Sequence, residues 1–141
     1  MNDTTAALRR RHYRFGWYSI LVFATLGAAL EALHATKAGF YLDVGNEMRR
    51  LMWRLGHAHG VLLGLIQLAF ALTLPESDHR SQRQLGWASG CLIAAGACLP
   101  LGFLLGGVFA RGGDPGLPVL LVPLGIPLLL AGLWWTARSF R

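Results

Sequence analysis

The stretch MRRLMWRLGHAHGVLLGLIQLAFALTL, from Met48 to Leu74, decides the fold class of this protein. It begins with charged residues and continues as an apolar run that is long enough for a helix to cross a bilayer, which takes about 20 residues. Three further runs of similar length occur in the chain, and the four lie at about residues 16–36, 51–74, 84–109 and 117–137. The sequence therefore predicts an all-α polytopic membrane protein, folded as a bundle of four transmembrane helices.

The composition supports this class and limits the domain organisation. Hydrophobic residues make up 54% of the 141 residues and charged residues only 14%, whereas soluble domains contain roughly 25% charged residues. A chain of this length is about one domain long. We therefore expect residues 1–141 to form a single integral membrane domain, with any functional site within or beside the spans.

The net charge of +6 is distributed as in membrane proteins, beside the apolar runs. If the N-terminus lies in the cytoplasm, the basic residues on the inside are Arg9, Arg10, Arg11, Arg14, Arg80, Arg83, Arg138 and Arg141. Those on the outside are then Lys37, Arg49, Arg50, Arg54 and Arg111. Because an excess of Lys and Arg marks cytoplasmic loops, we expect a multi-pass protein of a bacterial-type inner (plasma) membrane with both termini in the cytoplasm. The bilayer, and not nucleic acid, is the expected partner.

Small residues and prolines characterise the third and fourth spans. Gly86 and Gly90, and then Gly102 and Gly106, have the GxxxG spacing that lets transmembrane helices approach closely. This spacing predicts close helix contacts, within the chain or with another copy or subunit, so a homo-oligomer or a subunit of a membrane complex is expected. Pro100 interrupts the third span, and three prolines punctuate the fourth, which predicts kinks.

Ionisable side chains gather where the first span ends and the second begins. Glu31 and His34 are three residues apart and so share one face of the first helix, while Arg54 and His57 share one face of the second. Gly27 lies on the face of Glu31, so the first helix can approach a neighbour closely there. An unpaired charge costs on the order of 2.5–3.5 kcal/mol at the bilayer centre, so we expect these residues to pair in a polar pocket between the first two helices, in the outer leaflet.

The first hypothesis for this pocket is that it binds haem or a metal ion, because neutral imidazole is the commonest metal ligand. The candidate cofactor-binding residues are His34, Arg54 and His57, and the candidate metal ligands are Glu31, His34, His57 and His59. His57 and His59 lie about 200° apart around a helix, so they cannot bind the same ion. Without a CxxCH motif, the haem would be held noncovalently.

Two other hypotheses remain open. The protein could be a metal-free isomerase or mutase for a small hydrophobic molecule, with Glu31 and His57 as the catalytic acid–base residues. It could instead be a non-enzymatic structural or assembly subunit of a membrane complex, in which the polar residues only balance one another. The residues do not decide whether the chain is an enzyme.

The segment HAHGVLLG, His57 to Gly64, follows the loop VGNEMRRLM. Together they resemble the second-helix region of small four-helix membrane proteins of the hydroxylaminobenzene mutase type, which have an H-x-x-G-x-x-x-G pattern after a loop with Asn. His57, Gly60, Gly64 and Asn46 match that pattern, whereas His59 stands where the family usually has an acidic residue. This resemblance implies rearrangement of a small substrate. The segment GHAHG also resembles paired-histidine helices of haem–copper oxidase-like subunits, which implies haem binding.

Overall fold

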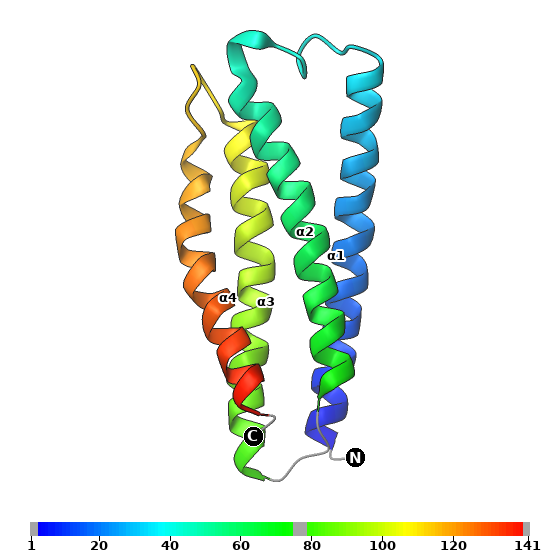
Figure 1. Ribbon diagram of the computed structural model, residues 1–141, viewed down its shortest axis with the longest axis vertical. Coiled ribbons are helices and arrows are strands. Elements are labelled where there is room, and N and C mark those ends of the chain that lie inside the picture. The colour runs from blue at the N-terminus through cyan, green and yellow to red at the C-terminus, as the bar shows by residue number, and fades with distance from the viewer. Residues whose placement is uncertain (1–2, 75–78, 140–141) are drawn as a thin grey trace.

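The computed structural model describes residues 3–74 and 79–139, which fold into four long helices (Figure 1). The helices are α1 (Asp3–Ala35), α2 (Glu47–Thr73), α3 (His79–Val108) and α4 (Leu121–Arg138), and two short 3₁₀ helices, η1 (Val44–Asn46) and η2 (Leu117–Leu120), precede α2 and α4. All four long helices are apolar and long enough to cross a membrane. The predicted all-α, four-helix fold is confirmed, and the helices have the character of a multi-pass membrane protein.

Helix α1 extends well beyond the predicted span, because the basic segment before residue 16 is also helical. Arg9 explains part of this extension: its guanidinium donates hydrogen bonds to the carbonyl oxygens of Ala71 (3.2 Å) and Leu74 (3.1 Å) at the end of α2. The last carbonyls of a helix have no partner within the helix. Arg9 therefore caps α2 and holds the start of α1 against it.

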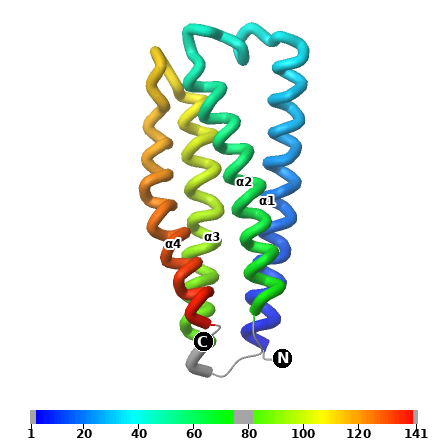
Figure 2. The backbone as a smooth tube through the Cα atoms, viewed as in Figure 1, coloured from blue at the N-terminus to red at the C-terminus, as the bar shows by residue number. Residues whose placement is uncertain are grey.

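The helices run antiparallel in chain order, and each packs mainly on its neighbours in the chain (Figure 2). The two chain ends lie at one end of the molecule, and the α1–α2 and α3–α4 connections lie at the other. Helix α4 packs against α3 and leaves a broad apolar surface exposed, which includes Leu124 and Leu130, both 61% exposed. Lipid would cover such a surface in a membrane.

Glycines mark the contact between α1 and α2. Gly16 and Gly64 lie opposite each other, and Gly60 lies against the ring of Phe23. Beside them, the hydroxyl of Ser19 donates a hydrogen bond to the carbonyl oxygen of Gly60 at 2.8 Å. These residues bring the two backbones close together in the middle of α1.

Helix α3 uses its glycines in two different ways. Gly102 and Gly106 face Val122 and Val119, so this pair contacts the fourth span and its 3₁₀ turn. A methyl group at Gly86 or at Gly90 would meet nothing within 4 Å. The contact of this second pair with another copy or subunit stays a prediction.

The prolines do not end the helices in which they lie. Pro100 is inside α3 and Pro127 is inside α4, and both helices continue past them. Pro118 is in the 3₁₀ turn η2, and Pro123 lies in the first turn of α4, where a proline needs no amide donor. The fourth span therefore holds three of the four prolines, and none of the three terminates it.

Candidate functional site

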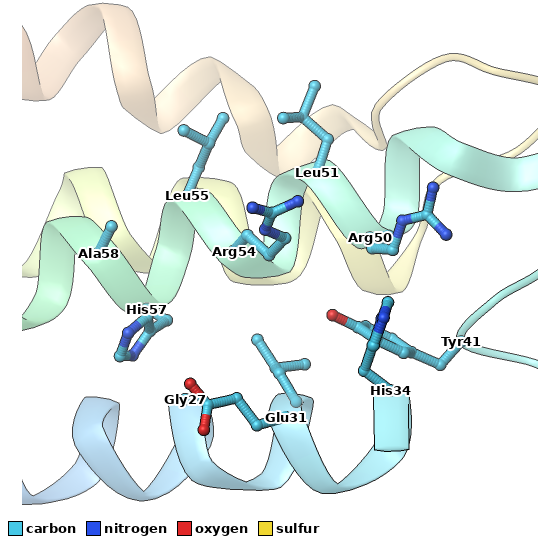
Figure 3. A pocket seen from close by; sticks show the side chains of 11 residues that line it. Gly27, Glu31, His34, Tyr41, Arg50, Leu51, Arg54, Leu55, His57 and Ala58 are labelled. Atoms are coloured by element: carbon cyan, nitrogen blue, oxygen red, sulfur yellow. The ribbon is translucent and has the colours of Figure 1, made fainter. Parts of the chain in front are cut away.

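A cavity of about 800 Å³ opens between α1 and α2, toward the end of the molecule that carries the α1–α2 connection (Figure 3). Its polar lining residues are Glu31, His34, Tyr41, Arg50, Arg54 and His57. All four residues of the predicted pocket, which are Glu31, His34, Arg54 and His57, therefore lie around one space. Leucines at positions 30, 51 and 55 form apolar walls.

The cavity exists because α1 and α2 diverge beyond their glycine contact (Figure 1). Gly60 packs on the ring of Phe23, and further along α1 Gly27 leaves room for an imidazole between the helices. A Cβ atom at Gly27 would lie 2.3–2.9 Å from three ring atoms of His57, which is too close for any real side chain. Gly27 is therefore required for the observed position of His57.

The position of His57 fixes the roles of its two nitrogens. Its Nδ1 lies 2.6 Å from the carbonyl oxygen of Phe23, and a nitrogen facing a carbonyl must carry the proton. In a neutral imidazole the other nitrogen, Nε2, is then a hydrogen-bond acceptor. Nε2 has no hydrogen-bond partner within residues 3–74 and 79–139. Such an Nδ1–H to carbonyl bond is also the usual way that proteins orient a histidine that binds a metal or a haem.

Glu31 extends into the cavity from α1, and its carboxylate lies on the side of His57 (Figure 3). The imidazole packs at Gly27, one helical turn deeper than Glu31. An ionised carboxylate is an acceptor of hydrogen bonds. Glu31 and His57 Nε2 thus present two acceptors to the same space.

The direct pairing expected among the four predicted residues does not form. In the part of the chain that the structure describes, the ion pair found is between Arg50 and Glu47 at 3.4 Å, on the surface of α2. Glu31, His34, Arg54 and His57 share the cavity without an ion pair between any two of them. The reason is that α1 and α2 have already diverged at this level, so the cavity lies between their polar side chains.

Tyr41 is a cavity residue that the sequence did not point to as part of a site. It comes from the connection between α1 and η1, is only 4% exposed, and stacks on Trp53 of α2 at a centroid distance of 6.3 Å. Figure 3 shows its hydroxyl beside the cavity, near His34. Helical spacing gives no information about a loop residue, so only the folded chain could place it.

His59 does not belong to the cavity. Its Nδ1 donates a hydrogen bond to the carbonyl oxygen of Leu55 in its own helix at 2.8 Å, and its ring lies 4.7 Å from that of Phe103 on α3. The described residues contain no group of three His, Cys, Asp or Glu side chains placed to hold a metal ion. The structure therefore gives no support to the predicted metal ligands, Glu31, His34, His57 and His59, as a set.

A second polar cluster, which the sequence did not reveal, joins three helices near the other end of the molecule. His12 donates from Nδ1 to the amide oxygen of Gln67 at 2.5 Å and accepts at Nε2 from the hydroxyl of Ser89 at 2.7 Å. Gln67 in turn donates to the carbonyl oxygen of Leu92 at 2.8 Å. His12 is fully buried and Gln67 and Ser89 are 1% exposed, so no substrate reaches them and the cluster serves to fix the helices.

Comparison with known proteins adds no assignment: no protein-family model matches the chain, and neither a curated protein nor a solved structure matches it significantly. The resemblances to hydroxylaminobenzene mutase-type proteins and to haem–copper oxidase-like subunits therefore stay predictions. The function must be argued from the cavity itself.

Proposed function

We propose that the α1–α2 cavity binds a small, largely apolar molecule that carries an O–H or N–H group. The observation that supports this proposal is the pair of acceptors, the Glu31 carboxylate and His57 Nε2, that face one space without a donor between them. A donor group of a bound molecule can pair with either acceptor, and a hydrogen bond to the charged carboxylate would stabilise the complex. Leu30, Leu51 and Leu55 suit the apolar part of the ligand.

The rim of the cavity complements this interior. Arg50 and Arg54 of α2 supply hydrogen-bond donors and positive charge. A ligand with a donor group at one end and an acceptor or anionic group at the other matches both ends of the cavity. An apolar ligand reaches the site from the lipid, because the cavity lies between two helices that are apolar enough to cross a membrane.

The chemistry that this pair supports is proton transfer. A ligand O–H or N–H can give its proton to one of the two acceptors, and that group, now protonated, can return the proton to another atom of the ligand while the second acceptor holds the ligand by a hydrogen bond. No electrons are exchanged in such a step, so it needs no oxidant or reductant. This is the chemistry of an isomerase or mutase, with Glu31 and His57 as acid–base residues.

Haem is the second candidate ligand, and the hydrogen bond from His57 Nδ1 to Phe23 favours it. That bond leaves Nε2 unprotonated, so His57 would be the residue that holds the haem iron. Arg50 and Arg54 are suited to the propionates. Both candidates depend on His57, but only the first depends on a ligand with a donor group.

We also propose that the cavity opens on the outer side of a bacterial-type inner membrane. Both chain ends lie at the opposite end of the molecule from the cavity. Of the 12 Lys and Arg positions within the described residues, seven lie at that end, so the positive-inside rule favours placing it in the cytoplasm.

The donor-group requirement can be tested with thymol and its methyl ether, two apolar probes that differ only in the O–H. We expect wild-type protein to bind thymol roughly tenfold more tightly than the ether, because the ether leaves both acceptors unpaired, a loss of about 1–3 kcal/mol. Glu31→Gln and His57→Ala should each reduce this preference. Calorimetric titration in the same micelles measures the preference, and the comparison of each variant with the wild type removes partitioning into detergent, because the partitioning of each probe is the same for every protein.

His59→Ala is the matched control, because it removes an imidazole from the same helix but from the side that faces α3. An equal preference in wild type and in His57→Ala would contradict the ligand proposal. Absorption spectra after addition of haem test the second candidate: a Soret band that is present in wild type and His59→Ala, and lost in His57→Ala, would assign haem. If the wild type shows neither a preference for thymol over its ether nor a Soret band with haem, the cavity has only a structural role.

A further inference from the structure

A second cavity, of about 660 Å³, lies on α1 at the end of the molecule that carries the chain termini. Arg10, Arg11 and Arg14 line it together with Phe15 and Tyr18, and Ile93 of α3 closes one side. These α1 residues are spaced by three or four positions, so they form one face of the helix. α1 and α3 make few contacts here, which leaves the space between them open.

Among the side chains that the structure describes, those of residues 3–74 and 82–139, the three arginines of this basic cavity have no acidic partner. The ion pair found among these side chains joins Arg50 and Glu47, near the other end of the molecule. Arg9 differs from them, because its guanidinium is committed to the carbonyls at the end of α2. Three guanidinium groups around one cavity repel one another, so an anion bound there would lower the energy of the arrangement.

The surface next to the basic cavity is apolar and faces outward. Trp17 and Leu21 are each 62% exposed and Val22 is 58% exposed, on the turns of α1 that follow the arginines. Tyr18, 63% exposed, lies between the two regions with an aromatic ring and a hydroxyl, a combination typical of the membrane–water interface. The cavity and this surface together match a molecule with an anionic head and an apolar tail.

We propose that the basic cavity binds the phosphate head group of an anionic phospholipid, whose acyl chains then lie along the exposed apolar surface of α1. Guanidinium groups bind phosphate oxygens in a bidentate manner. Basic pockets between transmembrane helices at the membrane surface are a recurring form of anionic lipid site. Free phosphate would use the arginines but not the apolar surface, so the lipid accounts for both features.

This inference is independent of the proposed function. The basic cavity and the α1–α2 cavity lie toward opposite ends of α1 and share no lining residue. The lipid site can therefore fail while ligand binding at Glu31 and His57 is retained, and the reverse also holds.

The test compares binding of phosphatidylglycerol and phosphatidylcholine to the purified full-length protein, by native mass spectrometry from detergent. We expect phosphatidylglycerol to bind more tightly, and Arg11→Gln/Arg14→Gln to weaken it roughly 30-fold, since one arginine near an anionic lipid contributes about fivefold. Raising the salt concentration from about 0.05 M to about 0.5 M should also weaken binding to the wild type, because salt screens charges.

Arg83→Gln/Arg138→Gln is the matched control: it removes the same charge from α3 and α4, at the same end of the molecule but outside the cavity. It should bind phosphatidylglycerol as the wild type does. An equal loss of affinity for phosphatidylglycerol in both double variants would show that net charge alone attracts the lipid, and would overturn the site. Equal binding of both lipids by the wild type, or displacement by millimolar inorganic phosphate, would also overturn it. The salt and phosphate measurements use the wild type, so they stand even if a variant does not fold.

Discussion

Gly60→Ala is expected to destabilise the protein by roughly 1–3 kcal/mol, as overpacking does at other close contacts, and to weaken binding of any ligand that depends on His57. The new methyl carbon would lie 2.0–2.6 Å from three ring atoms of Phe23. Phe23 is only 7% exposed and lies between the helices, so its ring cannot move aside without shifting α1. The carbonyl oxygen of the same residue holds His57, so a shift in α1 also removes the hydrogen bond that orients the imidazole.

The matched control is Gly90→Ala on α3, where a methyl group meets nothing within 4 Å. It should leave stability unchanged or raise it by up to about 1 kcal/mol, because alanine is the better helix former. Titration of the purified protein with SDS in mixed micelles gives the free energy of unfolding of both variants. A Gly60→Ala protein that is as stable as Gly90→Ala would mean that α1 and α2 do not touch at this point.

The second large effect is expected from His12→Ala, which should cost about 3 kcal/mol of stability, within the range for truncating a large buried side chain. The substitution leaves the amide oxygen of Gln67 and the hydroxyl of Ser89 without their partner in a buried site. It also removes the ring that packs on Phe70 at a centroid distance of 4.4 Å. Hydrogen bonds between membrane helices contribute about 0.6 kcal/mol on average, so most of the loss comes from packing.

His34→Ala is the control for this variant, because it removes the same side chain from the same helix at an exposed position beside the α1–α2 cavity. Its stability should stay within about 0.5 kcal/mol of the wild type. SDS titration measures both proteins under identical conditions. The buried cluster has no structural importance if His12→Ala unfolds at the same SDS fraction as His34→Ala.

The fold could be predicted from the sequence because the bilayer leaves few alternatives. Backbone groups in hydrocarbon must be paired within the segment, so each long apolar run becomes a helix. The α1–α2 cavity could also be predicted in part. Helical spacing placed Glu31 beside His34 and Arg54 beside His57, and Gly27 indicated the face on which the first helix meets its neighbour.

The remaining features depend on tertiary structure that spacing does not contain. The buried cluster requires α1 to continue as a helix through its basic segment and α3 to turn Ser89 toward it, whereas arginines before a span usually indicate orientation only. Tyr41 reaches the cavity from a loop. The absence of ion pairs among the four predicted residues follows from how far α1 and α2 diverge, a distance that the sequence does not define.

The packing of each helix on its neighbours in the chain has a consequence for biosynthesis. A membrane protein is synthesised from its N-terminus, and segments assemble as they emerge. Here α2 meets α1 as soon as it enters the membrane, and α3 then supplies Ser89 to a histidine and a glutamine that are already in place. Helix α4 arrives last and packs mainly on α3. No early helix has to wait beside the translocation machinery for a distant partner, so this chain can assemble at the pace of its own translation.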